Sequence, residues 1–535
     1  MAQASPTFQT IQELLRARRA ETALAVRFDD RQWTWQEHLD EAAAQAAALL
    51  GVMDTTRPAH VGALLGNTPD MLAAMAAAGL GGYVLCGINN TRRGPALQRD
   101  IRHADCQILL TDAEHRGLIE GLDLPGVQVL DTSTPHWATL LAEAGPLVPL
   151  REVGPTDTFM MIFTSGTSGD PKAVQIAHMT VLFAGLALVE RFAVTPQDVC
   201  YLSMPLFHSN ALLAGWSVAV GAGAAMAPAT FSASGLLHDV RRYGATYLNY
   251  VGKPLAYVLA TPEQPDDADN PLRVAFGNEA SDRDIAEFGR RFGCTVWDGF
   301  GSSEGAVIVT REDDCPPGSV GKGFPGVAIY DPDTVTECAV AEFTSHGALA
   351  NADKAIGELV NTTGAGLFQG YYNDSAATDD RLRHGMYWSG DLAYRDADGW
   401  IYLAGRTADW MRVDGENMTS APIERILLRH NGINQVAVYP VPDEHVGDQV
   451  MAAIVPYPDA DLVATEFGDF LAAQADLSPK AWPRRVWITD ALPSTATNKV
   501  LKRSLVALGP SPDGGRLWVR PARSATFTEH DRRTT

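Results

Sequence analysis

One short segment combines hydroxyl side chains, glycines and a lysine in a way that could hold a polyphosphate. It follows the apolar run Phe159 to Ile162 and reads Thr164-Ser165-Gly166-Thr167-Ser168-Gly169-Asp170-Pro171-Lys172. The glycines let backbone N–H groups turn inward, the hydroxyls are donors, and Lys172 adds a positive charge. It is not a Walker loop, because Pro171 stands where that loop needs glycine and no Ser or Thr follows Lys172. A flexible Gly/Ser linker is the alternative interpretation.

A second segment brings an aromatic ring, a hydroxyl and a carboxylate within five positions. Phe300-Gly301-Ser302-Ser303-Glu304-Gly305 follows the apolar pair Val296-Trp297. In a nucleotide site Phe300 would stack on the base, Ser303 would bond a phosphate, and Glu304 would hold magnesium. Taken alone, the segment could also be an ordinary turn.

Three further polar groups occur toward the end of the chain. Asp391 closes the run Tyr387-Trp388-Ser389-Gly390-Asp391, and Arg406 follows fifteen residues later, beyond a strand-like run. A carboxylate accepts hydrogen bonds from both hydroxyls of a ribose, while an arginine can approach from the other side. A turn or a helix cap is the alternative role for Asp391. Lys499 ends a stretch of small polar residues, where lysine is usually solvated surface.

The elements that must position these groups alternate between helix and strand. Amphipathic patterns such as Ile11 to Arg19 and Glu37 to Leu50 alternate with short apolar runs such as His60 to Leu65 and Tyr201 to Met204. This alternation predicts an α/β fold with sheets flanked by helices. We expect a large N-terminal region of several subdomains over residues 1–405, a small mobile α+β domain over 406–508, and a disordered tail over 509–535.

Composition limits the class of protein and its partners. The 535 residues are 46% hydrophobic, which is enough for more than one core, and 42 basic against 64 acidic side chains leave a formal charge of -22. This charge argues against nucleic acid as a partner. Six cysteines without a CxxC or Cys/His cluster, and no signal segment at the start, predict a reduced cytoplasmic protein without structural metal.

Two stretches without charged residues could be mistaken for membrane spans. Met71 to Asn89 and Ala211 to Phe231 are rich in alanine and glycine, and the second contains Pro228. Each is therefore expected to be a buried helix followed by a buried strand. Contact with a membrane surface, and a homodimer, stay open.

The motifs together, in this order, resemble the adenylate-forming superfamily of acyl-CoA synthetases, adenylation domains and luciferases. The resemblance covers nearly all of residues 10 to 505. Other segments are similar to the branch of fatty-acid transport proteins and very-long-chain acyl-CoA synthetases: Ile88 to Arg93, Asn249 to Gly252, Gly277 to Glu279, and Arg412 to Thr419.

The resemblance implies a reaction in two steps that uses ATP, Mg²⁺ and coenzyme A. A fatty acid carboxylate attacks the α-phosphate of ATP to give acyl-AMP and pyrophosphate, and a thiol then displaces AMP. Lys499, Glu304 and His208 are the expected catalytic residues, with magnesium on Glu304 and Thr164. The residues expected to bind nucleotide or coenzyme A are Thr164, Ser165, Gly166, Thr167, Ser168, Gly169, Lys172, Gly277, Asn278, Glu279, Asp298, Gly299, Phe300, Gly301, Ser303, Asp391, Arg406 and Gly415.

Some functional alternatives remain at this level. Ala408 stands where many members of the superfamily carry Asp or Lys at the hinge between domains, so the way in which this hinge is steadied is open. The acceptor could be a carrier protein, as in a fatty acyl-AMP ligase, and the acid could be a sterol or aryl acid. A non-catalytic acyl-binding protein is a further alternative, although it would not need Lys499 and Glu304.

Overall fold

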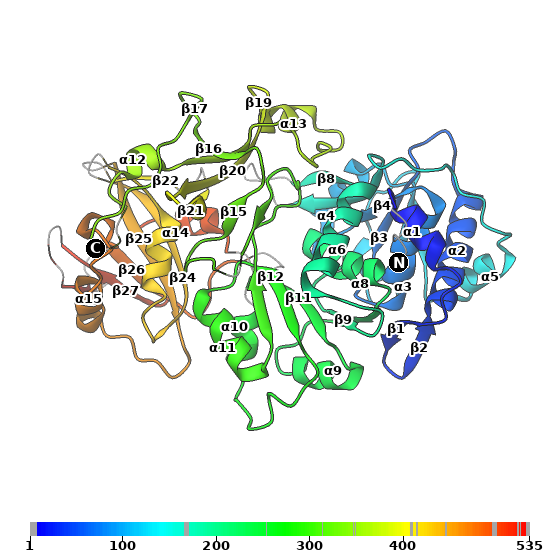
Figure 1. Ribbon diagram of the computed structural model, residues 1–535, viewed down its shortest axis with the longest axis horizontal. Helices are drawn as coiled ribbons and strands as arrows, with labels where there is room; N and C mark the ends of the chain where they lie inside the picture. Colours follow the sequence, from blue (N-terminus) through cyan, green and yellow to red (C-terminus); the bar gives the residue numbers. More distant parts are fainter. Residues whose placement is uncertain are drawn as a thin grey trace, which may run out of the picture. The chain divides into compact units, whose positions relative to one another are not determined.

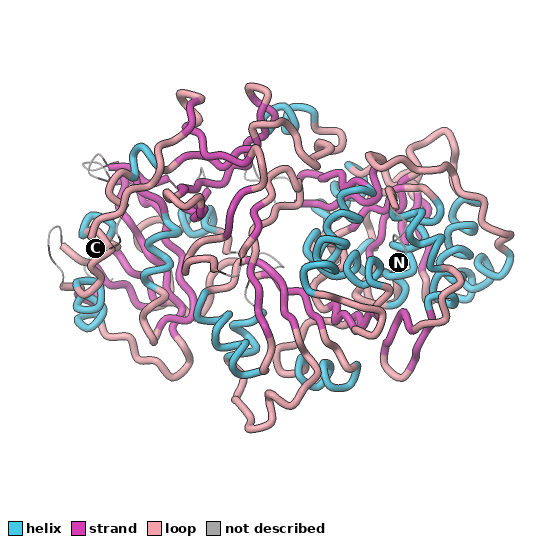
Figure 2. Tube along the Cα trace, in the orientation of Figure 1, coloured by secondary structure: helices cyan, strands magenta, loops and turns pink. Residues whose placement is uncertain are grey.

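The chain forms two compact units, each containing sheets and helices (Figures 1 and 2). The first unit comprises Met1–Ala306 and Ala365–Leu382, and the second comprises Val307–Gly364 and Arg383–Thr535. The computed structural model describes residues 8–164, 171–252, 254–312, 314–345, 347, 349–406, 410–413, 416–443, 447–494, 500–521, 524 and 526–530, with the backbone alone at 406, 410, 412, 416, 417, 443 and 447.

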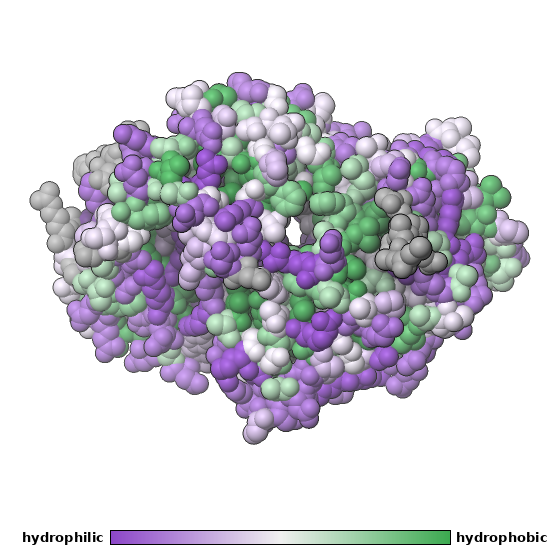
Figure 3. Space-filling view, in the orientation of Figure 1, coloured by the Kyte–Doolittle hydropathy of each residue, from purple (hydrophilic) through white to green (hydrophobic). Residues whose placement is uncertain are grey.

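One sheet of the first unit has the neighbour order β13-β12-β11-β9-β10-β1-β2 and is parallel except for the β1–β2 hairpin. Leu236, Val240, Phe288 and Phe292 from α9 and α11 pack in a core on this sheet, so the polar faces of both helices form the hydrophilic surface seen in Figure 3. The strands are β1 Leu24–Phe28, β2 Arg31–Thr34, β9 Val199–Leu202, β10 Ala225–Pro228, β11 Tyr247–Val251, β12 Val274–Asn278 and β13 Thr295–Asp298; the helices after β10 are α9 Leu236–Tyr243, α10 Pro254–Leu259 and α11 Asp282–Phe292.

The second sheet of this unit has the order β6-β5-β3-β4-β7-β8, with only β8 antiparallel to its neighbour. Leu97 and Ile101 of α4 pack on one face of the sheet with Cys86 and Met161. The strands are β3 His60–Leu64, β4 Val84–Gly87, β5 Ile108–Thr111, β6 Gln128–Asp131, β7 Thr158–Thr164 and β8 Lys172–Ala177; the helices of this part are α1 Ile11–Arg18, α2 Trp35–Val52, α3 Pro69–Gly81, α4 Gly94–His103, α5 Pro135–Glu143, α6 His178–Phe192 and α13 Ser375–Arg381.

The two charge-free stretches form buried helix-then-strand pairs, as the sequence predicted. In the first, α3 is buried along its length and leads to β4. In the second, a helix of three short segments, α7 Ser209–Ala211, the π-helix Leu212–Trp216 and α8 Ser217–Ala222, leads to β10. Across the described part of the chain, every helix is too short or too polar to cross a bilayer.

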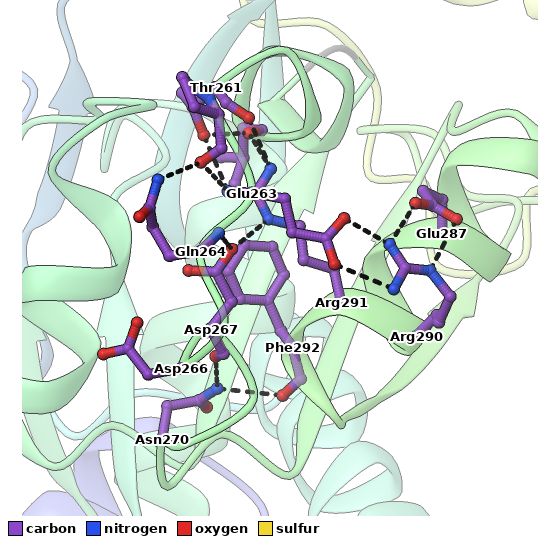
Figure 4. Close-up of polar contacts among 12 residues, drawn as sticks. Thr261, Glu263, Gln264, Asp266, Asp267, Asn270, Glu287, Arg290, Arg291 and Phe292 are labelled. Carbon is purple, nitrogen blue, oxygen red and sulfur yellow. Dashed lines mark hydrogen bonds and ion pairs between the residues drawn. The ribbon is translucent and has the colours of Figure 1, made fainter.

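A buried ion pair anchors the loop between α10 and β12 to α11 (Figure 4). Arg291 donates from Nε to Asp267 Oδ2 at 2.6 Å, and both side chains are at least 95% buried. Arg291 also donates to the carbonyl oxygens of Val258, Thr261 and Pro262, at 3.2, 2.8 and 3.0 Å. These bonds supply donors to backbone carbonyls at the end of α10 and in the loop that follows it.

The second unit begins with an antiparallel sheet. Its neighbour order is β14-β15-β21-β20-β18-β16-β17, and β19 pairs with β20. Arg425 on the helix α14, Ser420–Leu427, donates from Nη1 to the Gly318 carbonyl at 2.8 Å, which ties this part to the segment after Arg406. The elements are β14 Val309–Thr310, β15 Gly321–Gly323, β16 Val327–Asp331, β17 Thr336–Glu337, α12 Ala352–Ala355, β18 Gly357–Asn361, β19 Leu382–Arg383, β20 Met386–Arg395 and β21 Trp400–Arg406.

The same unit ends with a mixed sheet of order β23-β22-β25-β26-β27-β28, in which β24 pairs with β25. Ile423 and Phe467, from α14 and α15, pack on one face, and Leu505 of α16 packs on the other. This is the small α+β module that the sequence predicted. Its elements are β22 Trp410–Val413, β23 Glu416–Thr419, α14 Ser420–Leu427, β24 Ile433–Asp443, β25 Gly447–Pro456, α15 Ala464–Ala472, β26 Arg485–Ile488, α16 Lys502–Ala507, β27 Arg516–Val519 and β28 Thr528–Glu529.

The predicted disordered tail over residues 509–535 is wrong for its described part. β27 pairs antiparallel with β26, and Trp518 is 1% exposed in the core of the module. The apolar run Leu517-Trp518-Val519 is short and lies among polar residues, so composition did not identify it as a strand. Two of its side chains, Leu517 and Trp518, are nevertheless buried. The predicted boundary at residue 406 also differs from the division into compact units, and a mobile domain over 406–508 stays a proposal.

Candidate active site

The hydroxyl-rich loop connects two antiparallel strands of the first unit. Thr164 ends β7, Lys172 begins β8, and the two are cross-strand partners. The strands therefore hold the two ends of the loop together, as a phosphate-binding loop requires. Five of the expected nucleotide-binding residues, Ser165, Gly166, Thr167, Ser168 and Gly169, lie outside the described residues.

A tyrosine that the sequence analysis missed links Lys172 to Glu304. The Tyr371 hydroxyl donates to Glu304 Oε1 at 2.8 Å, and Lys172 Nζ lies 5.0 Å from the centroid of the Tyr371 ring. Burial, together with the charge of Glu304, raises the pKa of Tyr371 above its usual value, so the phenol keeps its proton and donates. Gly370-Tyr371-Tyr372 is a visible local pattern, but nothing in its spacing connects it to a carboxylate 67 positions earlier.

The Glu304 segment is also joined to the segment that contains His208. The hydroxyls of Ser303 and Ser209 lie 2.8 Å apart. His208 directly precedes Ser209, and its Nε2 atom is buried with no hydrogen-bond partner among the described residues. Burial lowers the pKa of His208 to about 4, so its imidazole is neutral near pH 7. Contact of this ring with a substrate carboxylate stays a proposal.

The expected adenine segment lies at the ends of neighbouring parallel strands. Gly277 is the cross-strand partner of Asp298, and Gly299 donates its backbone N–H to the Gly277 carbonyl at 2.8 Å. A side chain at Gly277 would collide with the backbone oxygen of Tyr250, which explains the glycine. Ligands of parallel sheets bind at such strand ends.

Two of the expected cofactor residues have bonds within the protein itself. Asp298 Oδ2 accepts from the Tyr250 hydroxyl at 3.1 Å and from the Ala280 N–H at 2.9 Å. Asn278 Oδ1 accepts from Asn210 Nδ2 at 3.1 Å. We therefore expect both residues to shape the nucleotide site, and direct contact with the nucleotide stays a proposal. Glu279, at φ 66°, Phe300 and Gly301 lie on the connections that follow these strands.

In the second unit the structure pairs the two residues expected to hold ribose. Asp391 on β20 and Arg406 on β21 are cross-strand partners, which fifteen residues of sequence separation did not reveal. Asp391 is 7% exposed, and its backbone N–H donates to Ser389 Oγ at 3.0 Å. The Arg406 side chain lies outside the described atoms.

Glu358 is a further residue that the sequence analysis missed. It is 3% exposed, and its Oε1 accepts the Gly390 N–H at 2.6 Å, directly beside Asp391. Glu358 Oε2 lies 3.5 Å from Arg383 Nη2. An acid within the apolar run Gly357 to Val360 was the signal that could have identified it. Three other expected positions, Lys499, Ala408 and Gly415, lie outside the described residues.

The family of the chain follows from comparison with known proteins. A model of the AMP-binding enzyme family matches residues 15–372, and a model of the AMP-binding enzyme C-terminal domain matches residues 422–499. The chain belongs to the family of AMP-binding enzymes, which confirms the resemblance to adenylate-forming enzymes. Assignment to the fatty-acid transport protein branch stays a prediction.

Among proteins of this family, the chain is similar to the medium/long-chain-fatty-acid–CoA ligase FadD17 of Mycobacterium marinum. The two are 52% identical over 90% of this chain and 93% of the relative. The steroid-22-oyl-CoA synthetase of Rhodococcus jostii is 45% identical over 93% of this chain and 90% of its own.

Solved structures confirm the fold. The ATP-bound MatB of Rhodopseudomonas palustris covers 93% of this chain, with 98% of its own length matched, at a TM-score of 0.81 and 22% identity. An anthranilate CoA ligase in complex with anthranoyl-AMP, AuaEII, covers 94% of this chain, with 98% of its own length, at a TM-score of 0.82 and 20% identity.

Proposed function

We propose that the chain activates a medium- or long-chain fatty acid with ATP and transfers the acyl group to coenzyme A. Identity of 52% with a medium/long-chain-fatty-acid–CoA ligase over 90% of the chain supports this substrate class. The observation that carries the proposal is the assembly of Lys172, Tyr371 and Glu304 at the end of the hydroxyl-rich loop. It combines a positive charge, an anchored carboxylate and a loop suited to phosphates.

In the first step an oxygen of the fatty acid carboxylate attacks the α-phosphorus of ATP. The new P–O bond forms as the bond to pyrophosphate breaks, and acyl-AMP remains. The neutral His208 orients the carboxylate, and Lys172 with its loop stabilises the leaving pyrophosphate. Lys499 would offset the charge that develops on the α-phosphate, and Asp391 with Arg406 would hold the ribose.

Glu304 fits a magnesium ion. Its Oε1 atom accepts a hydrogen bond from the Tyr371 hydroxyl, and no described residue donates a hydrogen bond to its Oε2 atom. Carboxylate oxygens are preferred magnesium ligands, and Thr164 could add a hydroxyl. When bound, the ion would offset triphosphate charge.

In the second step the thiol sulfur of coenzyme A attacks the acyl carbonyl, and AMP leaves with the bonding electrons. We place Gly415 beside the thiol path, where a side chain would obstruct it. Rotation of the C-terminal module at Ala408 would present Lys499 in the first step and open this thiol path in the second step.

The direct test measures release of AMP from ATP with a series of fatty acids of different chain length, with and without coenzyme A. We expect coenzyme-A-dependent turnover that rises with chain length, since each buried methylene contributes about 0.8 kcal/mol. Lys499→Ala serves as the inactive control. Acyl-AMP formed without thioester would indicate a carrier-protein acceptor, and binding of acid without AMP release would indicate a non-catalytic protein.

A second candidate substrate is a steroid side-chain acid. The 45% identity with a steroid-22-oyl-CoA synthetase over 93% of this chain favours including it. Steroid acids assayed beside fatty acids under the same conditions decide between them by the ratio of kcat/KM values.

We extend the proposal to a cytoplasmic location, with a peripheral membrane contact or a homodimer. Either contact would need an exposed apolar surface. Phe183 and Leu186, 46% and 38% exposed, lie one turn apart on α6. Vesicle sedimentation and mass measurement in solution test the two contacts separately.

A further inference from the structure

The Asn67 side chain joins the two parallel sheets of the first unit. Asn67 follows β3 of one sheet, on the connection to α3. Its Nδ2 atom donates to the carbonyl oxygens of Leu202 at 2.9 Å, Met204 at 2.8 Å and Ala229 at 3.1 Å. These three acceptors lie at the ends of β9 and β10 in the other sheet.

Both polar atoms of this amide are hydrogen-bonded within the unit. Two N–H protons face three carbonyl oxygens, so at least one proton is shared, and Oδ1 accepts the Leu206 N–H at 3.0 Å. Met204 and Ala229 lie beyond the last residues of β9 and β10, where the strand ladder no longer supplies donors. Asn67 therefore satisfies backbone groups that would otherwise need water.

The segment that Asn67 holds leads directly to His208. The His208 N–H donates to the Pro205 carbonyl at 2.9 Å, closing a turn one residue after Met204. On its other side the segment packs against β4, where a Cβ on Gly87 would lie 3.1 Å from both Cα and Cβ of Phe207. The backbone before His208 is thus fixed at two places, whereas the His208 Nε2 atom has no partner among the described residues.

We propose that Asn67 is a positioning residue for acid binding, acting through His208. By fixing the Met204 to His208 segment to both sheets, it sets the direction of the imidazole and so its alignment with the substrate carboxylate. This inference rests on the proposed function, because it assigns His208 to the carboxylate. A purely structural amide would lower stability without selecting one substrate.

Asn270 supplies a matched control. Its Nδ2 donates to two carbonyls, of Asp267 at 2.7 Å and Phe292 at 3.0 Å, and its Oδ1 accepts the Leu272 N–H at 2.9 Å. Asn270→Ala removes a similar set of backbone bonds in the same unit, on the loop beside α11. It should reduce stability without changing acid binding.

The experiment measures acid-dependent pyrophosphate exchange in Asn67→Ala, Asn67→Ser, Asn270→Ala and the wild type. We expect kcat/KM for the acid to fall about tenfold or more in both Asn67 variants, while KM for ATP changes less than about twofold. Asn67→Ser, which keeps a hydroxyl at this position, serves if Asn67→Ala does not fold. Asn270→Ala should retain wild-type kcat/KM.

A double-mutant cycle with His208→Ala tests the coupling. If Asn67 acts through His208, its replacement should have little further effect on kcat/KM in the His208→Ala background. Full additivity, or an Asn67 effect no greater than that of Asn270→Ala, overturns the inference while the proposed function stands. Absence of acid-dependent exchange in the wild type overturns both.

Discussion

At the scale of single residues, the site depends on hydrogen bonds that fix the direction of charged groups. Glu304 is held by one phenol, that of Tyr371, at 2.8 Å. The neighbouring Tyr372 directs its hydroxyl elsewhere, to Asp105 Oδ2 at 2.9 Å. Two adjacent tyrosines therefore make the same kind of bond in different places, and only one of these bonds involves a site residue.

Tyr371→Phe should impair adenylation by loosening Glu304. A hydrogen bond to a charged group is worth about 1.5 to 3 kcal/mol, so we expect the magnesium concentration for half-maximal pyrophosphate exchange to rise at least about tenfold. A magnesium titration of the variant measures this. Tyr372→Phe removes the adjacent hydroxyl and should titrate as the wild type does; equal shifts in both variants would contradict the assignment.

At the scale of elements, the loop between α10 and β12 depends on the buried Arg291–Asp267 pair (Figure 4). Arg291→Met leaves Asp267 buried without its partner, which should cost about 3 to 5 kcal/mol of unfolding free energy. Arg290→Met is the matched control, since Arg290 pairs with Glu263 and Glu287 at the exposed surface. Chemical denaturation of both variants measures the difference, and similar losses would show that burial of the pair is not the cause.

The strand β27 gives a second prediction at this scale. Leu517 and Trp518 are each 1% exposed, on opposite faces of the sheet, so removing them opens both cores of the C-terminal module. A chain that ends at Gly509 should lose at least about 3 kcal/mol of unfolding free energy, the cost typical of losing one large buried side chain. It should therefore unfold at a lower temperature than the full chain. A chain that ends at His530 keeps β27 and should melt as the full chain does. Equal melting of both truncations would indicate a dispensable tail.

At the scale of the whole molecule, buried histidines make stability depend on pH. Burial lowers the pKa of His38 and of His178 to about 4. Between about pH 6.5 and 4 the unfolded chain binds more protons than the folded one, so stability falls as the pH falls through this range. The loss approaches about 3 kcal/mol for each histidine at the acid end.

His178→Leu should weaken this dependence on pH. Both ring nitrogens of His178 lack a hydrogen-bond partner among the described residues, and the side chain is 1% exposed, so leucine removes a proton-binding group and no bond. We expect a smaller fall in melting temperature between pH 7 and pH 5 than in the wild type. His238→Leu, at an exposed position, is the control. An unchanged slope in His178→Leu would exclude this histidine as a cause.

Local order along the chain was readable without the structure. The amphipathic patterns from Ile11 and from Glu37 lie in α1 and α2, the apolar run from His60 forms β3, and Met71 to Asn89 is a buried helix followed by a strand. Backbone preference and hydrophobic periodicity act over a few residues, so such elements, and motifs carried within one turn, can be predicted from a short window.

The contacts that orient the site were decided only by the tertiary structure. Tyr371 reaches Glu304 across 67 positions, and Asn67 reaches Ala229 across 162. Asp391 and Arg406 become partners only because β20 and β21 are adjacent. β27, hidden in a polar stretch, is recognisable only beside β26. Which strands become neighbours depends on how the whole chain buries its apolar surface, and no short window of sequence contains that information.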